Sequence, residues 1–283
     1  MFSGGGPLGA LQVGALKAMA DHGIRPDLAV GTSVGALNAA WTSHDPSPVG
    51  LQRLESNWLT MREGDLFPGG RFKASWARML VRGNRVFENS GLKRAIVETL
   101  GDARFEDMQV PLAVTATDLD TGEERVFNSG PVLLPLLASA AMPGIFPPVV
   151  IDGHTYTDGG VANNVPIAPA VTMGATTLYV MDATSHSLQK RPLNRPMDYL
   201  LHAFSLARGQ RLTLERAFYQ DKVRIIMLPS AKLDFFVPFA SMEYTPRLIE
   251  TAYNQTSAFL GGDAQQATEQ IGDVEVEVIA PAK

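Results

Sequence analysis

The sequence contains no cysteine among its 283 residues. The chain therefore cannot form disulfides, bind a metal through thiolates or use a cysteine as a nucleophile. It also lacks an excess of positive charge, because 29 Asp and Glu residues outnumber 24 Lys and Arg residues and give a net charge of −5. Nucleic-acid-binding domains are usually basic, so we expect no nucleic-acid partner.

A secretory signal is not visible either, because the glycine run near the N-terminus follows no basic stretch and no apolar core. We therefore expect a cytoplasmic protein. The longest uncharged stretch, residues 126–151, has the length of a membrane span but contains five prolines and two glycines. Because these residues break helices, the stretch predicts a buried helix followed by an irregular loop.

The composition is typical of a globular protein, with 45% hydrophobic and 19% charged residues, and we expect one domain over residues 1–283. Strand-like and helix-like segments alternate from the N-terminus, which indicates an α/β fold with a largely parallel sheet. The expected strands are residues 1–3, 28–30, 112–117, 149–151, 154–157, 177–181 and 223–228. The expected helices are residues 9–22, 36–45, 196–219 and 246–260, with another starting near Pro166.

Ser33 lies in the segment GTSVG, between an expected strand and an expected helix. This is the pattern of a nucleophile elbow, a sharp turn in which small neighbours, here Gly31 and Gly35, let the strand and the helix approach closely. The N-terminus of the following helix favours developing negative charge. The alternative interpretation is a glycine-rich turn in which the serine only caps the helix.

A second glycine run, Gly4-Gly5-Gly6, follows the first expected strand and is a candidate oxyanion hole, because glycines let backbone N–H groups point at a ligand. Together with Gly9 the run also satisfies the GxGxxG pattern of dinucleotide-binding folds. Pro7 removes one N–H donor, and the acid expected after the second strand is missing. We therefore expect no nucleotide cofactor and rank a nucleotide-dependent oxidoreductase as the third alternative.

No histidine is marked by the sequence as the base for Ser33, and we expect structural or solvated roles for all five. They are His22, His44, His154, His186 and His202. An aspartate is more prominent, because Asp158 precedes Gly159-Gly160 directly after an expected hairpin. An Asp-Gly-Gly segment is also an ordinary turn. Because Asp158 and Ser33 are 125 residues apart, the sequence spacing cannot prove that they touch.

Three segments in this order, SGGGPLGALQVG (residues 3–14), GTSVGALNAA (31–40) and TDGGVANNVP (157–166), resemble the patatin-like phospholipase family. The linking segments VPLAVTATDLDTGE (110–123) and LASAAMPGIFPPV (137–149) share this resemblance. It implies a three-layer α/β/α fold with a core over about residues 3–182. Residues 183–283 would then form a variable, mostly helical cap and C-terminal region.

The resemblance implies a lipid acyl hydrolase of the phospholipase A or carboxylesterase type that uses a Ser–Asp dyad. Ser33 would be the nucleophile, Asp158 the base and Gly4–Gly6 the oxyanion hole, with no metal and no cofactor. A dyad explains why no histidine is prominent. The chain departs from the family at Leu8, where members often carry Arg or Lys, which leaves phospholipid preference open. The alternative is a catalytically silent lipid-binding or interaction protein on the same fold.

Three segments bear on the substrate. Residues 142–149 and 235–239 are apolar and could line an acyl-chain site or belong to the core. Residues 66–87 carry five cations and no acid, and place Trp76, Met79 and Leu80 on one helical face. That pattern fits a peripheral contact with an anionic membrane, or a solvated helix with a stripe of core residues.

Overall fold

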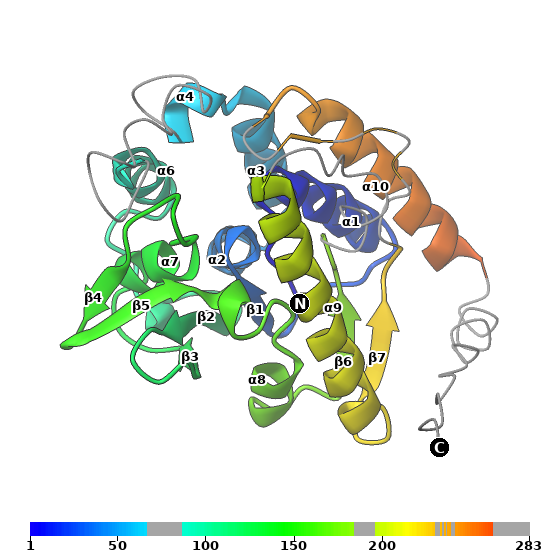
Figure 1. The fold of residues 1–283 in the computed structure, drawn as a ribbon. Helices are drawn as coiled ribbons and strands as arrows, with labels where there is room; N and C mark the ends of the chain where they lie inside the picture. Colours follow the sequence, from blue (N-terminus) through cyan, green and yellow to red (C-terminus); the bar gives the residue numbers. More distant parts are fainter. Residues whose placement is uncertain are drawn as a thin grey trace, which may run out of the picture.

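The computed structural model describes residues 1–66, 87–183, 196–229 and 241–262, together with Leu233, Phe235, Val237 and Pro238. Strands and helices alternate along the chain, and helices cover both faces of a central sheet (Figure 1). The expected α/β/α fold is therefore confirmed. The predicted basic segment at residues 66–87 lies outside the described residues, except for its two ends.

One half of the sheet is parallel. Its strands are β1 (Ala29–Thr32), β2 (Leu112–Asp118), β6 (Thr177–Val180) and β7 (Arg224–Met227). β1 pairs with β2 and β6 pairs with β7, each in parallel. Phe2 forms parallel bridges with Gly31 and with Met181, so the N-terminal segment joins the two pairs. The expected first strand is thus reduced to a single bridging residue.

The other half of the sheet is antiparallel, which the sequence predicted only in part. Its strands are β3 (Glu124–Phe127), β4 (Val149–Ile151) and β5 (His154–Asp158). β4 and β5 form the expected hairpin, and the two turn residues, Asp152 and Gly153, have φ values of 50° and 84°. Positive φ at both central residues is the signature of a type I′ turn, which suits the twist of paired strands.

β1 and β5 share one edge of β2, and this arrangement determines the geometry of the candidate site. Thr115 pairs with Thr32 of β1 and, on its other side, with β3. The next residue, Ala116, pairs with β3 and with Asp158 of β5. The C-terminal ends of β1 and β5 therefore meet at adjacent positions of β2, although they are far apart in the sequence.

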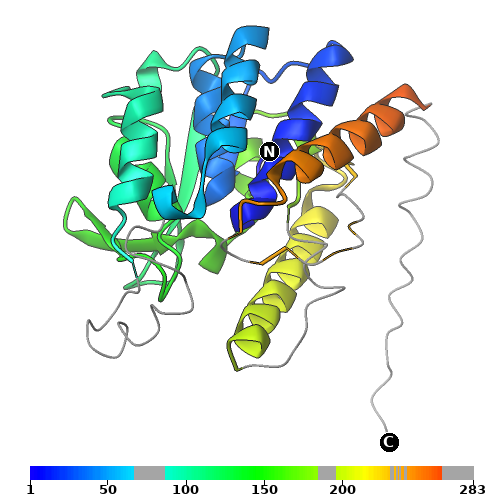
Figure 2. The same ribbon diagram turned by 90° about the horizontal axis from the view of Figure 1, so that it is seen from above.

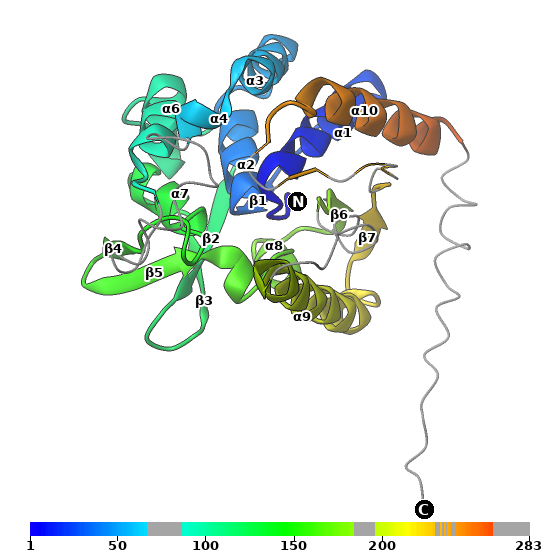
Figure 3. The same cartoon turned by 45° about the horizontal axis from the view of Figure 1, so that its top comes forward.

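The helices form two layers (Figure 3). One layer holds α1 (Gly9–Asp21), α2 (Val34–His44), α3 (Pro48–Thr60), α6 (Ser90–Leu100), α7 (Leu133–Ser139) and α10 (Thr245–Gly261). The opposite face carries α8 (Ile167–Thr172) and α9 (Pro196–Tyr219). Shorter turns are α4 (Glu63–Leu66) and the 3₁₀ segments η1 (Gly6–Leu8), η2 (Phe105–Asp107) and η3 (Gly159–Val161). Strand side chains alternate between two hydrophobic clusters, with Ala29 in one and Val30 in the other.

α10 crosses α1 closely, as two views show (Figures 1 and 2). A Cβ atom built on Gly14 would lie 2.1 Å from the carbonyl oxygen of Ile249, so only glycine permits this crossing. The last glycine of the segment at residues 3–14 therefore serves helix packing. In the described ranges of the chain, no helix has both the length and the apolar character needed to cross a bilayer. The expected buried helix within residues 126–151 is α7.

Candidate active site

Ser33 lies at a strained turn between β1 and α2, with φ 56° and ψ −128°. A non-glycine residue rarely adopts this conformation, and it persists only where the surroundings enforce it. A Cβ atom on Gly31 would lie 2.4 Å from the Gly35 carbonyl oxygen, and one on Gly35 would lie 2.3 Å from the Phe2 carbonyl oxygen. Both glycines are therefore required by the close packing that the elbow pattern predicted.

Ser139, at the C-terminal end of α7, anchors this turn. Its fully buried Oγ accepts a hydrogen bond of 2.8 Å from the backbone N–H of Ser33. The bond holds a residue with strained backbone dihedral angles from a second element. Sequence reasoning did not single out Ser139, because one serine inside an apolar helix carries no distinguishing signal.

Ser33 and Asp158 are in direct contact. Ser33 Oγ donates a hydrogen bond of 2.6 Å to Asp158 Oδ2. Ser33 is half-buried, whereas Asp158 is only 2% exposed. The contact arises because β1 and β5 end at adjacent residues of β2, a juxtaposition that their spacing in the sequence did not show.

Asp158 is surrounded by groups that favour its charged form. Its Oδ1 accepts a hydrogen bond of 2.8 Å from the Gly160 N–H and lies 3.9 Å from Nη2 of Arg208 on α9. Burial raises the pKa of Asp158, while Arg208, the Ser33 hydroxyl and the Gly160 N–H oppose that rise. A raised pKa makes the carboxylate a stronger base than an exposed aspartate.

The glycine loop lies beside Ser33. A Cβ atom on Gly4 would lie 3.0 Å from the Ser33 Cβ, so glycine permits this approach. The N–H of Gly4 points to the carbonyl oxygen of Asn164 at 3.4 Å. Gly5 and Gly6 are partly exposed, and their N–H groups have no hydrogen-bond partner within the described part of the chain. They are therefore available to a ligand.

Gly9, the last glycine of the dinucleotide-like pattern, has a packing role. A Cβ atom at this position would lie 2.7 Å from Val34 Cγ2 and 2.9 Å from the Trp58 ring. Leu8 is buried in the same core cluster. The spacing that resembles a nucleotide-binding fingerprint is thus explained by contacts at the elbow and with α3.

The histidines that the structure describes make no hydrogen bond to Ser33 or Asp158. His154 is exposed and lies 3.4 Å from Asp118, and its position at the start of β5 is about 13 Å from Asp158. His44 ends α2, at the opposite end of that helix from Ser33. His22 Nδ1 lies 2.8 Å from the Ala18 carbonyl oxygen, His202 lies on α9, and His186 is outside the described residues.

Two further largely buried acids, Glu124 and Glu215, lie near the site. Asn163 Nδ2 donates hydrogen bonds to Glu215 of α9 at 2.7 Å and to Glu124 of β3 at 3.2 Å. Arg211 contacts both carboxylates, at 3.1 Å and 3.9 Å. Burial, together with the like charge of Glu215, raises the pKa of Glu124 to about 7. Across the described residues, no group of three acidic or histidine side chains is placed to hold a metal ion.

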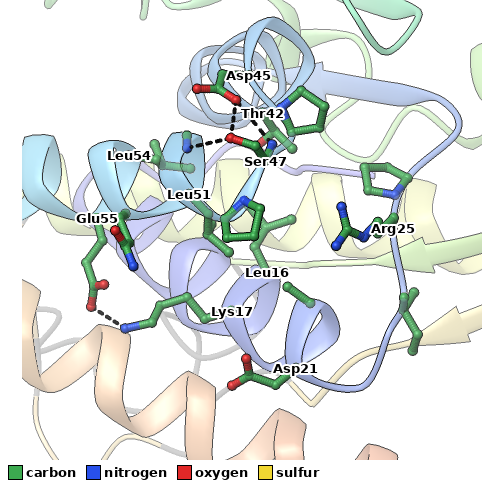
Figure 4. A pocket seen from close by; sticks show the side chains of 17 residues that line it. Leu16, Lys17, Asp21, Arg25, Thr42, Asp45, Ser47, Leu51, Leu54 and Glu55 are labelled. Atoms are coloured by element: carbon green, nitrogen blue, oxygen red, sulfur yellow. Dashed lines mark hydrogen bonds and ion pairs between the residues drawn. The ribbon is translucent and has the colours of Figure 1, made fainter.

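A cavity of about 220 Å³ lies between α1, α3 and the loop that joins α2 to α3 (Figure 4). Apolar side chains such as Leu16 and Leu51 line it, and Lys17 and Glu55 form an ion pair at one side. It adjoins Asp45, beyond the C-terminal end of α2, and α2 is about 16 Å long. The cavity is therefore separate from Ser33, which precedes α2.

The apolar segments expected to bear on the substrate are only partly described. Phe235 packs against the core and stacks on Tyr244, with 5.0 Å between ring centroids. Phe236 and Phe239 lie outside the described residues. Residues 142–149 begin three residues after the end of α7, and Ile145 and Val149 are buried. The buried residues of the first segment and the partly buried Phe235 and Val237 of the second therefore contribute to the core.

The comparisons with known proteins agree on one family. The sequence profile of the patatin-like phospholipases matches residues 1–171. A patatin-like phospholipase domain-containing protein of Caenorhabditis elegans is 30% identical over 190 residues, which are 65% of this chain and 13% of that protein. Mouse patatin-like phospholipase domain-containing protein 6 is 29% identical over 187 residues, with the same two shares. Lysophospholipase nte1 of Aspergillus terreus is 28% identical over 188 residues, or 65% and 12%. The match spans about an eighth of each relative.

Proposed function

The chain belongs to the patatin-like phospholipase family, and we propose that it is a serine acyl-ester hydrolase acting on lipids. The observation that carries this proposal is the contact of 2.6 Å between Ser33 Oγ and Asp158 Oδ2 at a strained strand-to-helix turn. A lysophospholipase among the relatives is consistent with a lipid ester as substrate. We further propose that residues 1–283 form one domain.

In the proposed acylation step, Asp158 accepts the Ser33 proton while Ser33 Oγ attacks the acyl carbonyl carbon. The existing hydrogen bond already directs that proton at Oδ2. Collapse of the tetrahedral intermediate breaks the ester bond, and the protonated Asp158 returns the proton to the leaving alcohol. The same carboxylate then accepts a proton from water as the water attacks the acyl-enzyme. Collapse of this second intermediate breaks the ester bond to Ser33 and releases the acid, and Asp158 returns the proton to Ser33 Oγ.

We propose that the N–H groups of Gly5 and Gly6 stabilise the oxyanion. Both glycines are partly exposed and follow Gly4, which lies against Ser33, and their N–H groups have no partner in the part of the chain that the structure describes. Gly4 would contribute chiefly by its missing side chain, which keeps the loop against Ser33. Each donor to an oxyanion typically contributes about 3–4 kcal/mol of transition-state stabilisation. The N-terminus of α2 adds a favourable dipole.

The test is hydrolysis of chromogenic acyl esters of increasing chain length, with the wild type beside Ser33→Ala. Activity that is lost in the variant supports the proposal, and the preferred chain length indicates the size of the acyl site. Parallel assays with phospholipid and lysophospholipid would resolve the head group. A folded wild type that hydrolyses none of these and does not react with a fluorophosphonate probe would instead support a lipid-binding protein without catalytic activity.

We also propose a peripheral membrane contact through the outward face of α9. Tyr199, Leu206, Leu214 and Phe218 on this face are between 51% and 70% exposed. Exposed large apolar side chains along one helix favour insertion into a lipid surface. The helix also carries Arg208 to Asp158, so the face and the site belong to the same part of the molecule.

The membrane proposal predicts that Leu206→Gln with Leu214→Gln weakens binding to phosphatidylcholine vesicles by about tenfold or more, since burying each leucine contributes about 1.5 kcal/mol or more. Co-sedimentation measures the binding. Leu59→Gln on α3, where the leucine is also exposed, is the matched control and should bind as the wild type does. Equal binding by all three proteins would refute this contact.

A further inference from the structure

We propose that Arg208 is a positioning residue for the hydrolysis: it aims the Asp158 carboxylate at Ser33 and balances the charge of that carboxylate. This inference rests on the proposed function, in which Asp158 is the base. Neither the motifs at residues 3–166 nor the family profile, which ends at residue 171, includes Arg208. The residue lies near the middle of α9.

Arg208 is held by groups from three directions. Its Nε donates a hydrogen bond of 2.7 Å to the Gly160 carbonyl oxygen, and its Nη2 lies 3.9 Å from Asp158 Oδ1. Its guanidinium plane lies over the Phe204 ring at 4.0 Å from the centroid. The side chain is only 14% exposed. A buried arginine with a fixed planar group orients its partners more strictly than a mobile surface lysine would.

This arrangement assigns different roles to the two oxygens of Asp158. Oδ1 is engaged by the Gly160 N–H and by Arg208, whereas Oδ2 faces the Ser33 hydroxyl. Rotation of the carboxyl group would break the contacts of Oδ1. The pair of contacts on Oδ1 therefore keeps Oδ2 in the position where it receives the proton.

Gly160 provides the space for this arrangement. A Cβ atom on Gly160 would lie 2.3 Å from Arg208 Nη2. The second glycine after Asp158 is thus explained by a contact with a helix that begins 36 residues later in the sequence. The carbonyl group of this glycine accepts from Arg208, and its N–H donates to Asp158, so Gly160 links the cation to the base.

The charge of Arg208 acts on a carboxylate that is almost fully buried. Within the described residues, Arg208 is the charged group that faces Asp158, and its positive charge lowers the pKa that burial raises. Asp182, which follows β6, is the second carboxylate whose charge acts on Arg208. Without Arg208, the carboxyl group would hold its proton to higher pH and could not accept one from Ser33.

The experiment compares Arg208→Met, Arg208→Lys and the wild type. Arg211→Met is the matched control, because Arg211 lies on the same helix and pairs with carboxylates but does not contact Asp158. Two readouts are recorded against pH: the rate of covalent labelling by a fluorophosphonate, and kcat/KM on a soluble short-chain ester. Thermal unfolding of each protein reports whether it is folded.

For Arg208→Met we expect a loss of about 100-fold in both rates, since misplacing a catalytic group by about 1 Å has an effect of this size. The acid limb of both pH profiles should move to higher pH, because the base ionises later. Arg208→Lys should keep the position of the limb and recover part of the rate. Arg211→Met should match the wild type in both readouts.

An unchanged acid limb in folded Arg208→Met would overturn the inference, as would an equal shift in Arg211→Met. If Arg208→Met does not fold, Arg208→Lys decides the matter: a wild-type rate and limb would show that the hydrogen bond to Gly160 and the ring contact have no catalytic effect. Failure of the proposed function is recognised separately, because the wild type itself would then fail to react with the fluorophosphonate.

Discussion

Asp158 and Glu124 are both largely buried carboxylates, and each faces an arginine on the same helix, α9. Arg208 lies 3.9 Å from Asp158, and Arg211, three residues later, lies 3.9 Å from Glu124. Burial raises the pKa of both groups. By burial and charge alone the two acids would be equal candidates for a catalytic role.

The two carboxyl groups differ in their other interaction partners. Both oxygens of Asp158 have partners, and one of these is the hydroxyl of a serine at a strained turn. Glu124 has a second carboxylate, Glu215, as its neighbour, and its buried Oε1 has no hydrogen-bond partner among the described residues. A buried carboxyl group with a raised pKa therefore indicates catalysis only where a nucleophile and space for a substrate lie next to it.

The largest expected effect tests this difference directly. Asp158→Asn should lower kcat by about 10⁴-fold, because an amide cannot accept the Ser33 proton, and Ser33→Ala should lower it at least as much. Glu124→Gln should leave kcat within about twofold of the wild type. Ester hydrolysis by the three folded variants measures this contrast, and equal losses in Asp158→Asn and Glu124→Gln would contradict it.

The next effect concerns stability. The pKa of Glu124 is raised from 4.5 to about 7, so the folded state keeps a proton that the unfolded chain loses above pH 4.5. This group therefore makes stability fall as the pH rises from 4.5 to 7, by at most about 3.4 kcal/mol. Glu124→Gln removes this pH-dependent loss of folding stability. We expect it to raise Tm relative to the wild type at pH 8 and to change it little at pH 4.5.

Measurement of Tm against pH for both proteins checks this expectation. Glu106→Gln is a suitable control, because its carboxylate is exposed and its pKa is lowered by a hydrogen bond from the Gly130 N–H. The control should show no gain at pH 8. A pH dependence of Glu124→Gln that equals that of the wild type would show that Glu124 is ionised in the folded protein at neutral pH.

The smallest expected effect concerns the hydrogen bond between Ser139 and the turn at Ser33. Ser139→Ala removes the acceptor of the Ser33 N–H and should lower kcat about fivefold, since a neutral hydrogen bond contributes about 1 kcal/mol. Unfolding stability should fall by a similar amount. Ser43→Ala, which removes another buried hydroxyl of the helical layer, is the control because Ser43 Oγ has no hydrogen-bond partner in the described ranges of the chain. Equal activity in the two variants would show that Ser139 does not position Ser33.

Several elements could be predicted from local pattern. The helix at residues 9–22 ends beside Gly23, whose φ is 74°, and the turn at Asp152-Gly153 has the positive φ angles that these residue types favour. The sequence reading did not single out α6 or β3. α6 carried a usable signal, because Leu92, Ile96 and Leu100 recur every four residues and are buried. β3 has only four residues and a mixed burial pattern, so its pairing with β2 defines it.

The sequence by itself determined the strained elbow at Ser33, because only a chain with glycine at positions 31 and 35 permits that turn. It also determined the glycine loop and the hairpin that leads to Asp158. The tertiary structure alone decided which acid Ser33 contacts, because β1 and β5 end at adjacent residues of β2. It also brought Ser139 and Arg208 to the site, from helices whose own sequences carry no sign of it. Backbone geometry depends on neighbouring residues in the sequence, whereas contacts between distant side chains depend on strand register and helix packing.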